Sequence, residues 1–561
     1  MSEQESNSAP SAQKDSFKLG QNKLGQKLKS VPFVSFAIAA LASIPILAVL
    51  LSLFPIKPAL WSDLWATTLP AYVGNSLLLM ILTGAIACVI GTGAAWCVTM
   101  LKFPGRKVLS WLLILPLASP AYIIGYVYVD LLEFYGPLQS SLRHVFGWGA
   151  GDYAFPPIRT LPGAAFILGL VLYPYIYLMA RAAFSLQSMS QWQAARSLGL
   201  SPKKAFWRVA LPAARPGIIA GLALVLMETL ADFGVADYFG IPTLSTGIFR
   251  NWLAGGDRDA AMKLAAVMLV FVFLLTYMEA WNRKGKAETL GKTAQQTARI
   301  ALGSKTKWAV SLFCAVPVLI GFVIPILRLL YYAVHQTDAQ TKAHFFTYAK
   351  NSLTVAFIVA VIAVLIAVIL AYTQRKTTHK FTKLAIRLST FGYALPGALL
   401  AVGLLAPIGI LDQNLTGFAK AHLSWGGGLI LSGTIALLVY ALVIRFLTVS
   451  FNALNSGFDK IPTSMDAAAR SLGAKPLSLI RRIHIPLLSQ SLLVAAILVF
   501  IDVLRELPAT LILRPFNFDT LATRIYWLAS DERLAEASTA ALSIILMGLI
   551  PVILLNRKLD H

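Results

Sequence analysis

About a dozen apolar runs, each long enough to cross a bilayer as a helix, dominate this 561-residue chain. A hydrocarbon core about 30 Å thick needs roughly 20 helical residues. Only 13% of the residues are charged, whereas a soluble domain uses about a quarter. Because lipid offers backbone groups no hydrogen bonds, the runs predict an all-α polytopic membrane protein. The predicted spans are residues 33–54, 75–100, 108–131, 161–185, 215–240, 262–282, 307–334, 351–373, 386–411, 428–450, 488–513 and 535–556.

Lysine and arginine give the chain a net charge of +23 and gather in alternate loops. Cytoplasmic loops retain such charge, so residues 1–32, the linker 283–306 and both chain ends are predicted to be cytoplasmic. Residues 1–32 are polar and are expected to form a disordered tail. The basic residues are scattered over separate loops, which favours membrane lipid and argues against nucleic acid as a partner. The three cysteines lie in apolar runs, which predicts neither disulfides nor a metal site.

The second half of the chain repeats the first at a spacing of about 275 residues. Tyr72-x-x-Asn75-Ser76-Leu77 returns as 348–353, and Pro120 returns as Pro396. The two predicted transmembrane domains are residues 33–282 and 307–561, with six spans each. Because each half has an even number of spans, the two repeats are expected to point the same way.

A polar insert separates the fourth and fifth spans of each half, at 186–214 and 451–487. The sequence A-A-R-S-L-G occurs in both inserts, at 194–199 and 468–473. Each insert predicts a short helix that ends at the glycine, followed by another that begins at Ser201-Pro202 or Pro476. Ser190 in the first copy, and Thr463 or Ser464 in the second, are the predicted N-caps.

These inserts resemble the E-A-A-x-x-x-G cytoplasmic signature of ABC importer permeases, with Gln193 or Ala467 in place of the glutamate and Asp466 just before Ala467. The resemblance implies that the short helices dock on ATPase subunits. The alternative is that the small residues only pack two helices closely. The coupling residues implied are Gln193, Ala194, Ala195, Gly199, Ala467, Ala468, Ala469 and Gly473.

The chain offers no convincing nucleotide site of its own. Its nearest approach to a phosphate loop, residues 20–27, lacks the G-K-[ST] ending and follows no predicted strand. No nucleophile motif of an intramembrane enzyme lies in a predicted span. We therefore expect a transport permease, not an enzyme, which binds no cofactor. ATP and Mg²⁺ would belong to two copies of a partner ATPase, and a separate binding protein would deliver the substrate.

Carboxylates inside the spans are costly in lipid and are therefore candidates for function. Glu228 and Asp232 in the fifth predicted span align with Asp502 and Glu506 in the eleventh. At a spacing of four, each pair is expected on one helix face. Four converging carboxylates would suit a hard cation, whereas ion pairing, with Arg505 as the partner of Asp502 or Glu506, is the structural alternative. The candidate translocation path comprises Glu228, Asp232, Asp237, Asp502, Arg505 and Glu506, and no metal ligand set is assigned.

Longer stretches resemble the fused, two-domain permeases of ferric-iron ABC importers. They are residues 227–234 with 237–239 and 243–248 in the first half, and 505–510 with 513–515, 518–522 and 529–533 in the second. The resemblance implies a type I importer fold in the bacterial inner membrane and Fe³⁺ delivered by a periplasmic iron-binding protein. Chelated iron, another metal, a polyamine or thiamine are alternative substrates. A secondary transporter with parallel halves is the alternative mechanism.

Overall fold

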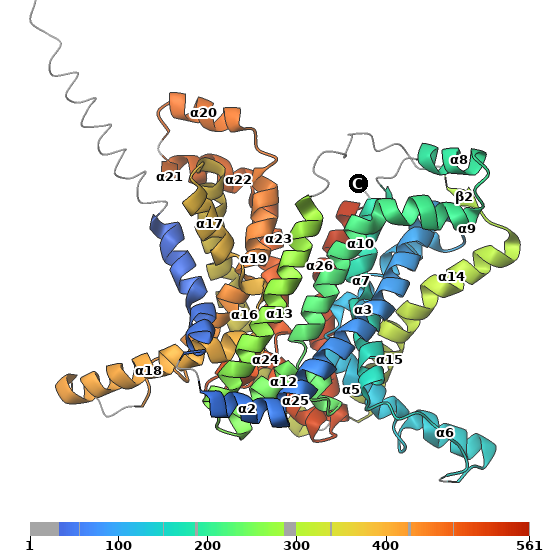
Figure 1. The fold of residues 1–561 in the computed structure, drawn as a ribbon, viewed down its shortest axis with the longest axis horizontal. Helices are drawn as coiled ribbons and strands as arrows, with labels where there is room; N and C mark the ends of the chain where they lie inside the picture. The colour runs from blue at the N-terminus through green and yellow to red at the C-terminus, as the bar shows by residue number, and fades with distance from the viewer. Residues whose placement is uncertain are drawn as a thin grey trace, which may run out of the picture. The chain divides into compact units, whose positions relative to one another are not determined.

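The computed structural model describes residues 33–54, 57–149, 151–185, 189–284, 299–336, 339–423, 428–474 and 476–559. The described chain is almost entirely helical (Figure 1). Its strands are a parallel pair of two residues each, β1 (Leu101–Lys102) and β2 (Ile300–Ala301). The all-α architecture predicted from the sequence is confirmed.

The first helix spans Phe33–Leu51. The elements of the first half then follow as α2 (Pro58–Thr67), α3 (Leu69–Met100), α4 (Arg106–Leu112), η1 (Leu115–Ala118), α5 (Ala121–Leu132), α6 (Pro137–Phe146), α7 (Leu161–Ser185), α8 (Met189–Ser197), α9 (Pro202–Ala205), η2 (Phe206–Ala210), α10 (Leu211–Ala231), α11 (Gly234–Tyr238), α12 (Leu244–Phe249), η3 (Arg250–Ala254) and α13 (Arg258–Lys284).

The second half repeats this order. Its elements are α14 (Ser304–Val318), η4 (Leu319–Val323), α15 (Ile324–His335), α16 (Ala339–Lys376), α17 (Lys380–Ser389), η5 (Gly392–Ala394), α18 (Gly397–Leu423), α19 (Ile435–Phe458), α20 (Thr463–Ser471), α21 (Pro476–Leu479), η6 (Ile480–His484), α22 (Ile485–Leu487), α23 (Ser489–Leu504), α24 (Pro508–Leu513), α25 (Leu521–Ser530) and α26 (Leu534–Leu559).

Within the described residues, ten helices are long and apolar enough to cross a membrane, or twelve if each of two bent pairs counts as one span. This agrees with the predicted dozen. Several predicted spans are nevertheless broken. The span predicted at 108–131 turns by 92° between Ala118 and Ala121, and the one predicted at 386–411 divides into α17 and α18. The repeated prolines explain both breaks, because Pro120 and Pro396 each directly precede a new helix and cannot continue an old one.

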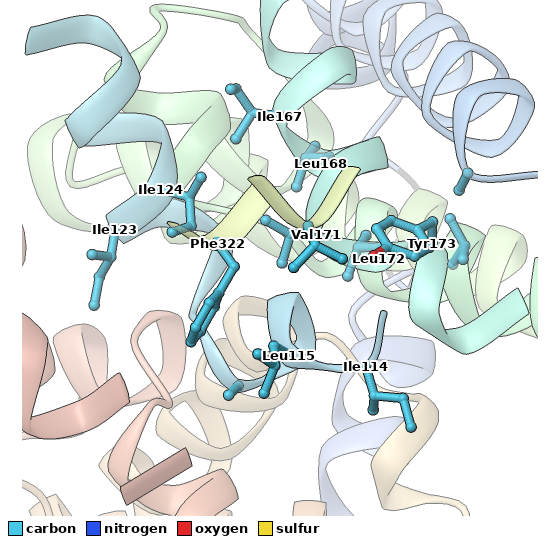
Figure 2. Close-up of a cluster of buried hydrophobic side chains, with 14 of the residues drawn as sticks. Ile114, Leu115, Ile123, Ile124, Ile167, Leu168, Val171, Leu172, Tyr173 and Phe322 are labelled. Atoms are coloured by element: carbon cyan, nitrogen blue, oxygen red, sulfur yellow. The ribbon is translucent and has the colours of Figure 1, made fainter. Parts of the chain in front are cut away.

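The described chain forms two compact units. Unit 1 contains residues up to Ile44, Ala360–Tyr393 and Phe446–Val499, and unit 2 contains Pro45–Val359, Ala394–Arg445 and Phe500 onwards. Each unit has its own apolar core. Figure 2 shows part of the core of unit 2, where isoleucines of α5 and a row of α7 side chains surround Phe322 of η4. The predicted domain boundaries at 283–306 remain a prediction.

The repeated Asn-Ser pair has the same structural role in both halves. The side-chain amide of Asn75 on α3 donates to the carbonyl oxygen of Pro242 at 3.0 Å, and Ser76 Oγ accepts the backbone N–H of Leu244 at 3.0 Å. In the second half Asn351 donates to the Asp519 carbonyl oxygen at 3.0 Å, and Ser352 Oγ accepts from Leu521 at 2.8 Å. A long helix in each half thus holds the start of a short one, α12 or α25.

Both short helices also begin with a capping box. The hydroxyl of Thr243 accepts the backbone N–H of Thr246, and Thr520 does the same for Thr523. These threonines satisfy N–H groups that the first helical turn leaves without partners. Figure 1 places α12 and α25 at the same end of unit 2, with α8 at the opposite end, as expected for repeats that point the same way.

We expect Ser76→Ala to destabilise the protein by about 1–3 kcal/mol, because it leaves the buried N–H of Leu244 without a partner. The measurement is denaturant-induced unfolding of the purified protein in detergent micelles. Ser62→Ala removes an exposed hydroxyl of α2 and is the matched control, with little expected change. Equal stability of the two variants would show that the Ser76 contact contributes nothing.

Candidate functional site

The repeated A-A-R-S-L-G segments form two short helices, α8 and α20, that share one type of C-terminal turn. Leu200 donates its backbone N–H to the Ala195 carbonyl oxygen at 3.2 Å, and Ala474 donates to Ala469 at 3.0 Å. Gly199 and Gly473 have φ values of +84° and +79°. These are Schellman turns, in which glycine is favoured because side chains disfavour positive φ. The predicted helix ends are confirmed.

The two short helices bury and expose equivalent positions. Ala195 and Ala469 are buried, whereas Gln193, Ala194, Ala467 and Ala468 are exposed. The outermost side chains are leucines that the sequence analysis did not select. Leu198 is 84% exposed and Leu472 is 89% exposed. The signal was present in the sequence, since both leucines belong to the repeated motif.

The predicted N-caps of these helices are wrong. The structure places Ser190 inside α8, and α20 has Pro462 as its N-cap residue, without a side-chain cap. The guanidinium of Arg375 donates to the carbonyl oxygens of Ile461 and Pro462 at 2.9 and 3.1 Å and so fixes the chain just before α20. The start of α9 is confirmed, with Ser201 Oγ accepting the Lys204 N–H at 3.3 Å.

Aromatic side chains attach α8 to the rest of unit 2. Trp192 of α8 is buried, and its ring centroid lies 5.2 Å from that of Trp96 on α3. The Trp96 ring also contacts Phe184 at 5.3 Å and Phe206 at 4.9 Å. Such clusters depend on apolar burial and ring geometry rather than on charge.

An ionic network attaches α20 within unit 1. Asp466, which is equivalent to Trp192, is buried and accepts from Arg375 Nε at 3.0 Å. His484 Nε2 lies 2.8 Å from its other oxygen. Burial opposes ionisation of Asp466, but the hydrogen bonds from His484 and Arg375 outweigh burial and hold the pKa of its carboxyl below the usual range. The acidic residue beside the motif therefore anchors the helix and does not face outward.

The predicted continuous helices across residues 215–240 and 488–513 are wrong. In the first half α10 ends at Ala231, Asp232 is extended, and α11 begins at Gly234. Asp232 therefore does not share a helix face with Glu228. Its Oδ2 accepts the backbone N–H of Ala236 at 3.0 Å. The physical reason for the break is that this carboxylate satisfies an N–H group of the new helix, which no residue of α10 can reach.

The second half has an equivalent break, at which the carboxylate accepts more hydrogen bonds. Glu506 lies between α23 and α24, so it does not share a helix face with Asp502. Its oxygens accept the backbone N–H groups of Ala509 and Thr510, both at 2.9 Å, and the Thr510 hydroxyl at 2.7 Å. Arg445 Nη1 lies 3.3 Å from Oε1. Glu506 is buried and caps a helix while paired with an arginine.

Asp502, Arg505 and Asp237 also have ionic partners. Arg505 pairs with Asp502, as one of the sequence alternatives expects, and donates to the Leu117 carbonyl oxygen at 3.2 Å. Asp237 accepts from the Tyr526 hydroxyl at 2.7 Å and lies 3.4 Å from Arg250. Among the described residues, no cation forms an ion pair with Asp232. Asp232 thus has an environment unlike that of the second-half carboxylates.

Two tyrosines of α5 complete this region and were missed by the sequence analysis. Tyr122 and Tyr126 are buried, and neither hydroxyl has a hydrogen-bond partner among the described residues. A Cβ on Gly234 would lie 2.5 Å from the Cβ of Tyr122 and 3.2 Å from Leu507, so α11, α5 and the second-half break meet closely. Tyr126 packs edge-on against Tyr238, with ring centroids 4.4 Å apart.

The Tyr122 and Tyr126 pair could have been found from its i, i+4 spacing after Pro120, which places two phenols on one face of α5. The site contains several side-chain oxygen atoms of the kind that bind cations. No group of three or more His, Cys, Asp or Glu side chains is placed to hold a metal ion in the described part of the chain. The carboxylate groups supply oxygen ligands of the kind that hard cations prefer.

Comparison with known proteins identifies relatives of the whole chain and of its parts. Residues 87–284 match the family described as "Binding-protein-dependent transport system inner membrane component". The Fe(3+)-transport system permease protein FbpB 2 of Haemophilus influenzae is 24% identical over 493 residues, which cover 86% of this chain and 89% of that protein.

Shorter relatives match part of the chain. The spermidine/putrescine transport system permease protein PotB of Haemophilus influenzae is 31% identical over 232 residues, 39% of this chain and 79% of that protein. The molybdenum transport system permease protein ModB of Escherichia coli is 26% identical over 204 residues, 35% of this chain and 86% of that protein.

We expect Asp466→Asn to loosen α20, because removing one partner leaves the buried guanidinium of Arg375 without its carboxylate. Breaking a buried pair costs about 3–5 kcal/mol, which should appear as faster hydrogen exchange of the α20 amides. Asp459→Asn, at an exposed position just before α20, is the matched control and should change nothing. Unchanged exchange in Asp466→Asn would contradict the anchoring role.

The same anchor predicts a dependence on pH. Because the folded-state pKa of Asp466 is lowered, its stabilisation is complete above about pH 4, near the unfolded pKa, and disappears as the pH falls through the folded value. Exchange at α20, corrected for intrinsic rates, should therefore become the same in wild type and Asp466→Asn in strong acid. A difference between the two proteins that persists unchanged there would contradict the ionic mechanism.

Proposed function

Because the chain belongs to the family of binding-protein-dependent transport system inner-membrane components, we propose that it is the permease of an importer for ferric iron. Its relatives are ABC transport permeases and not enzymes, and ATP is hydrolysed by separate subunits. The proposed importer takes Fe³⁺ from a periplasmic iron-binding protein and releases it into the bacterial cytoplasm. Both ends of the chain and the two short helices α8 and α20 face the cytoplasm.

The observation that carries the iron proposal is the full-length likeness to an iron permease. That relative matches 86% of the chain, whereas the polyamine and molybdenum permeases match 39% and 35%. A match of that length must extend into both halves of the chain, whereas each shorter relative matches little more than a third of it.

The chemistry of the first-half break supports the same cargo. Asp232 and the phenols of Tyr122 and Tyr126 supply oxygen donors, which a small trivalent cation prefers. An oxyanion would be repelled by the carboxylate. Because Asp502 and Glu506 are neutralised by Arg505 and Arg445, the first half carries the net negative charge of the path.

The coupling surface follows from the exposed faces of α8 and α20. We assign one ATPase subunit to each helix, so that two copies bind one permease chain. The exposed side chains of Leu198 and Leu472 insert into the ATPases, and the Schellman turns at Gly199 and Gly473 keep these leucines fixed. When the ATPases close on ATP, the anchored helices transmit the movement to α3 and α7 through Trp96 and Phe184, and to α16 through Arg375.

The cargo path is tested by Asp232→Asn combined with Tyr126→Phe. We expect uptake of radioactive Fe³⁺ by cells expressing the complete importer to fall about tenfold or more, since losing roughly 1.4 kcal/mol of differential binding lowers a rate tenfold. ATPase activity stimulated by the loaded binding protein should persist, because the coupling helices are unchanged. Asp459→Asn serves as the control. If the double variant took up Fe³⁺ at the wild-type rate, Asp232 and Tyr126 would have no role in the cargo path, and the role of Asp232 would be structural only.

Docking is tested by Leu198→Ala combined with Leu472→Ala. Each substitution removes an apolar side chain worth about 1.5–3 kcal/mol when buried in a partner, so ATPase subunits should copurify at least tenfold less. Leu253→Ala, at an exposed leucine of η3, is the matched control. The permease itself should insert normally. Full retention of the ATPases by the double variant would show that these leucines do not dock.

A further inference from the structure

We propose that a basic pocket at the α8 end of unit 2 binds the phosphate group of an anionic phospholipid. The pocket has a volume of about 590 Å³ and lies where the chain turns from α3 into α4. Four cationic side chains line it, and the remaining lining residues are apolar or glycine. The lining consists of Lys102, Phe103, Gly105, Arg106, Lys107, Val108 and Arg299.

The fold builds this pocket from segments that lie about 200 residues apart in the chain. The parallel pairing of β1 with β2 sets Leu101 beside Ile300 and Lys102 beside Ala301, which brings Arg299 to the pocket. Ser311 Oγ on α14 donates to the Pro104 carbonyl oxygen at 2.9 Å and fixes the loop between β1 and α4. Tertiary contacts, rather than a simple run of basic residues, therefore assemble the pocket.

The lining of the pocket favours an anion. A hydrogen bond from Arg106 Nη1 to the Val98 carbonyl oxygen at 3.1 Å holds the side chain of Arg106, which lines the pocket. No carboxylate lines the pocket, and none among the described residues forms an ion pair with Lys102, Lys107 or Arg299. Arginine and lysine together form the donor set that phosphate groups prefer in proteins.

The position of the pocket, at the end of a candidate membrane span, points to a lipid as the source of the phosphate. The pocket begins directly after α3, a candidate membrane span that ends at Met100, and the contact of Trp96 with Trp192 places this end beside α8. Apolar side chains that face outward continue from the pocket along α4 and α14, which pack together. Val108, Trp308 and Leu312 are 60%, 63% and 62% exposed.

A phospholipid matches both parts of this surface, because its phosphate can enter the basic pocket while its acyl chains cover the outward-facing apolar side chains. A soluble phosphate would use only the first part. The second half keeps only one of three equivalent cations: the repeat offset that pairs Tyr72 with Tyr348 places Thr378, Thr382 and Lys383 at the positions of Lys102, Arg106 and Lys107. The inference is one lipid site per chain, and it does not depend on the cargo.

The test is lipid binding to the purified, delipidated full chain, measured by native mass spectrometry. We expect phosphatidylglycerol to bind at least tenfold more tightly than phosphatidylcholine. Millimolar glycerol 3-phosphate or inorganic phosphate should not displace it. Equal binding of the two lipids would overturn the proposal, and displacement by the soluble phosphates would reassign the pocket to a soluble ligand.

Variants separate the pocket from general surface charge. Lys102→Gln with Lys107→Gln and Arg299→Gln should lower phosphatidylglycerol affinity at least tenfold. Lys380→Gln with Lys383→Gln and Arg387→Gln removes the same number of charges from α17, the second-half counterpart of α4, and should have little effect. Lys102→Arg with Lys107→Arg keeps the charge and should keep the binding, which guards against loss of fold. Equal losses in the two neutralised triple variants would overturn the proposal.

Discussion

Backbone polar groups at an interrupted helix inside a bilayer must find partners within the protein, and this requirement shapes the two helix breaks. Both halves meet it with a carboxylate. Asp232 accepts an N–H group of α11, and Glu506 accepts two of α24. Serines of the long helices meet the same need at α12 and α25. The helix breaks therefore carry acidic side chains for a structural reason, and any role in transport is added to that one.

The two halves share this scaffold but use different chemistry on it. Trp192 and Asp466 occupy equivalent positions, yet one joins an aromatic cluster and the other an ionic network. The carboxylates differ in the same way, since Glu506 is paired with an arginine, whereas Asp232 accepts the backbone N–H of Ala236 and forms no ion pair among the described residues. Fusion of two domains in one chain allows this divergence, because each half always meets the same partner.

Much of the fold could be predicted from the sequence. Lipid restricts spanning segments to helices, and the length of an apolar run indicates whether it can cross the bilayer. The internal repeat identified α8 and α20, since glycine at positive φ leaves a sequence signal. The breaks at Asp232 and Glu506 could not be seen, because Ala231–Gly234 and Arg505–Pro508 lie within runs that are otherwise apolar enough to span. Hydropathy does not distinguish a carboxylate that caps a new helix from one on the face of a continuous helix. The Arg445 partner of Glu506 lies 61 residues away, beyond any local pattern.

The most direct test of the account is the cargo of the unmodified protein. Cells that produce the permease with its ATPase and binding protein are offered radioactive Fe³⁺, molybdate, sulfate and putrescine in parallel, and uptake that depends on the permease is measured for each. The oxygen-rich, net acidic break predicts accumulation of Fe³⁺ alone. Permease-dependent accumulation of molybdate or sulfate without iron would contradict the account, because an anion would then pass the carboxylate of Asp232.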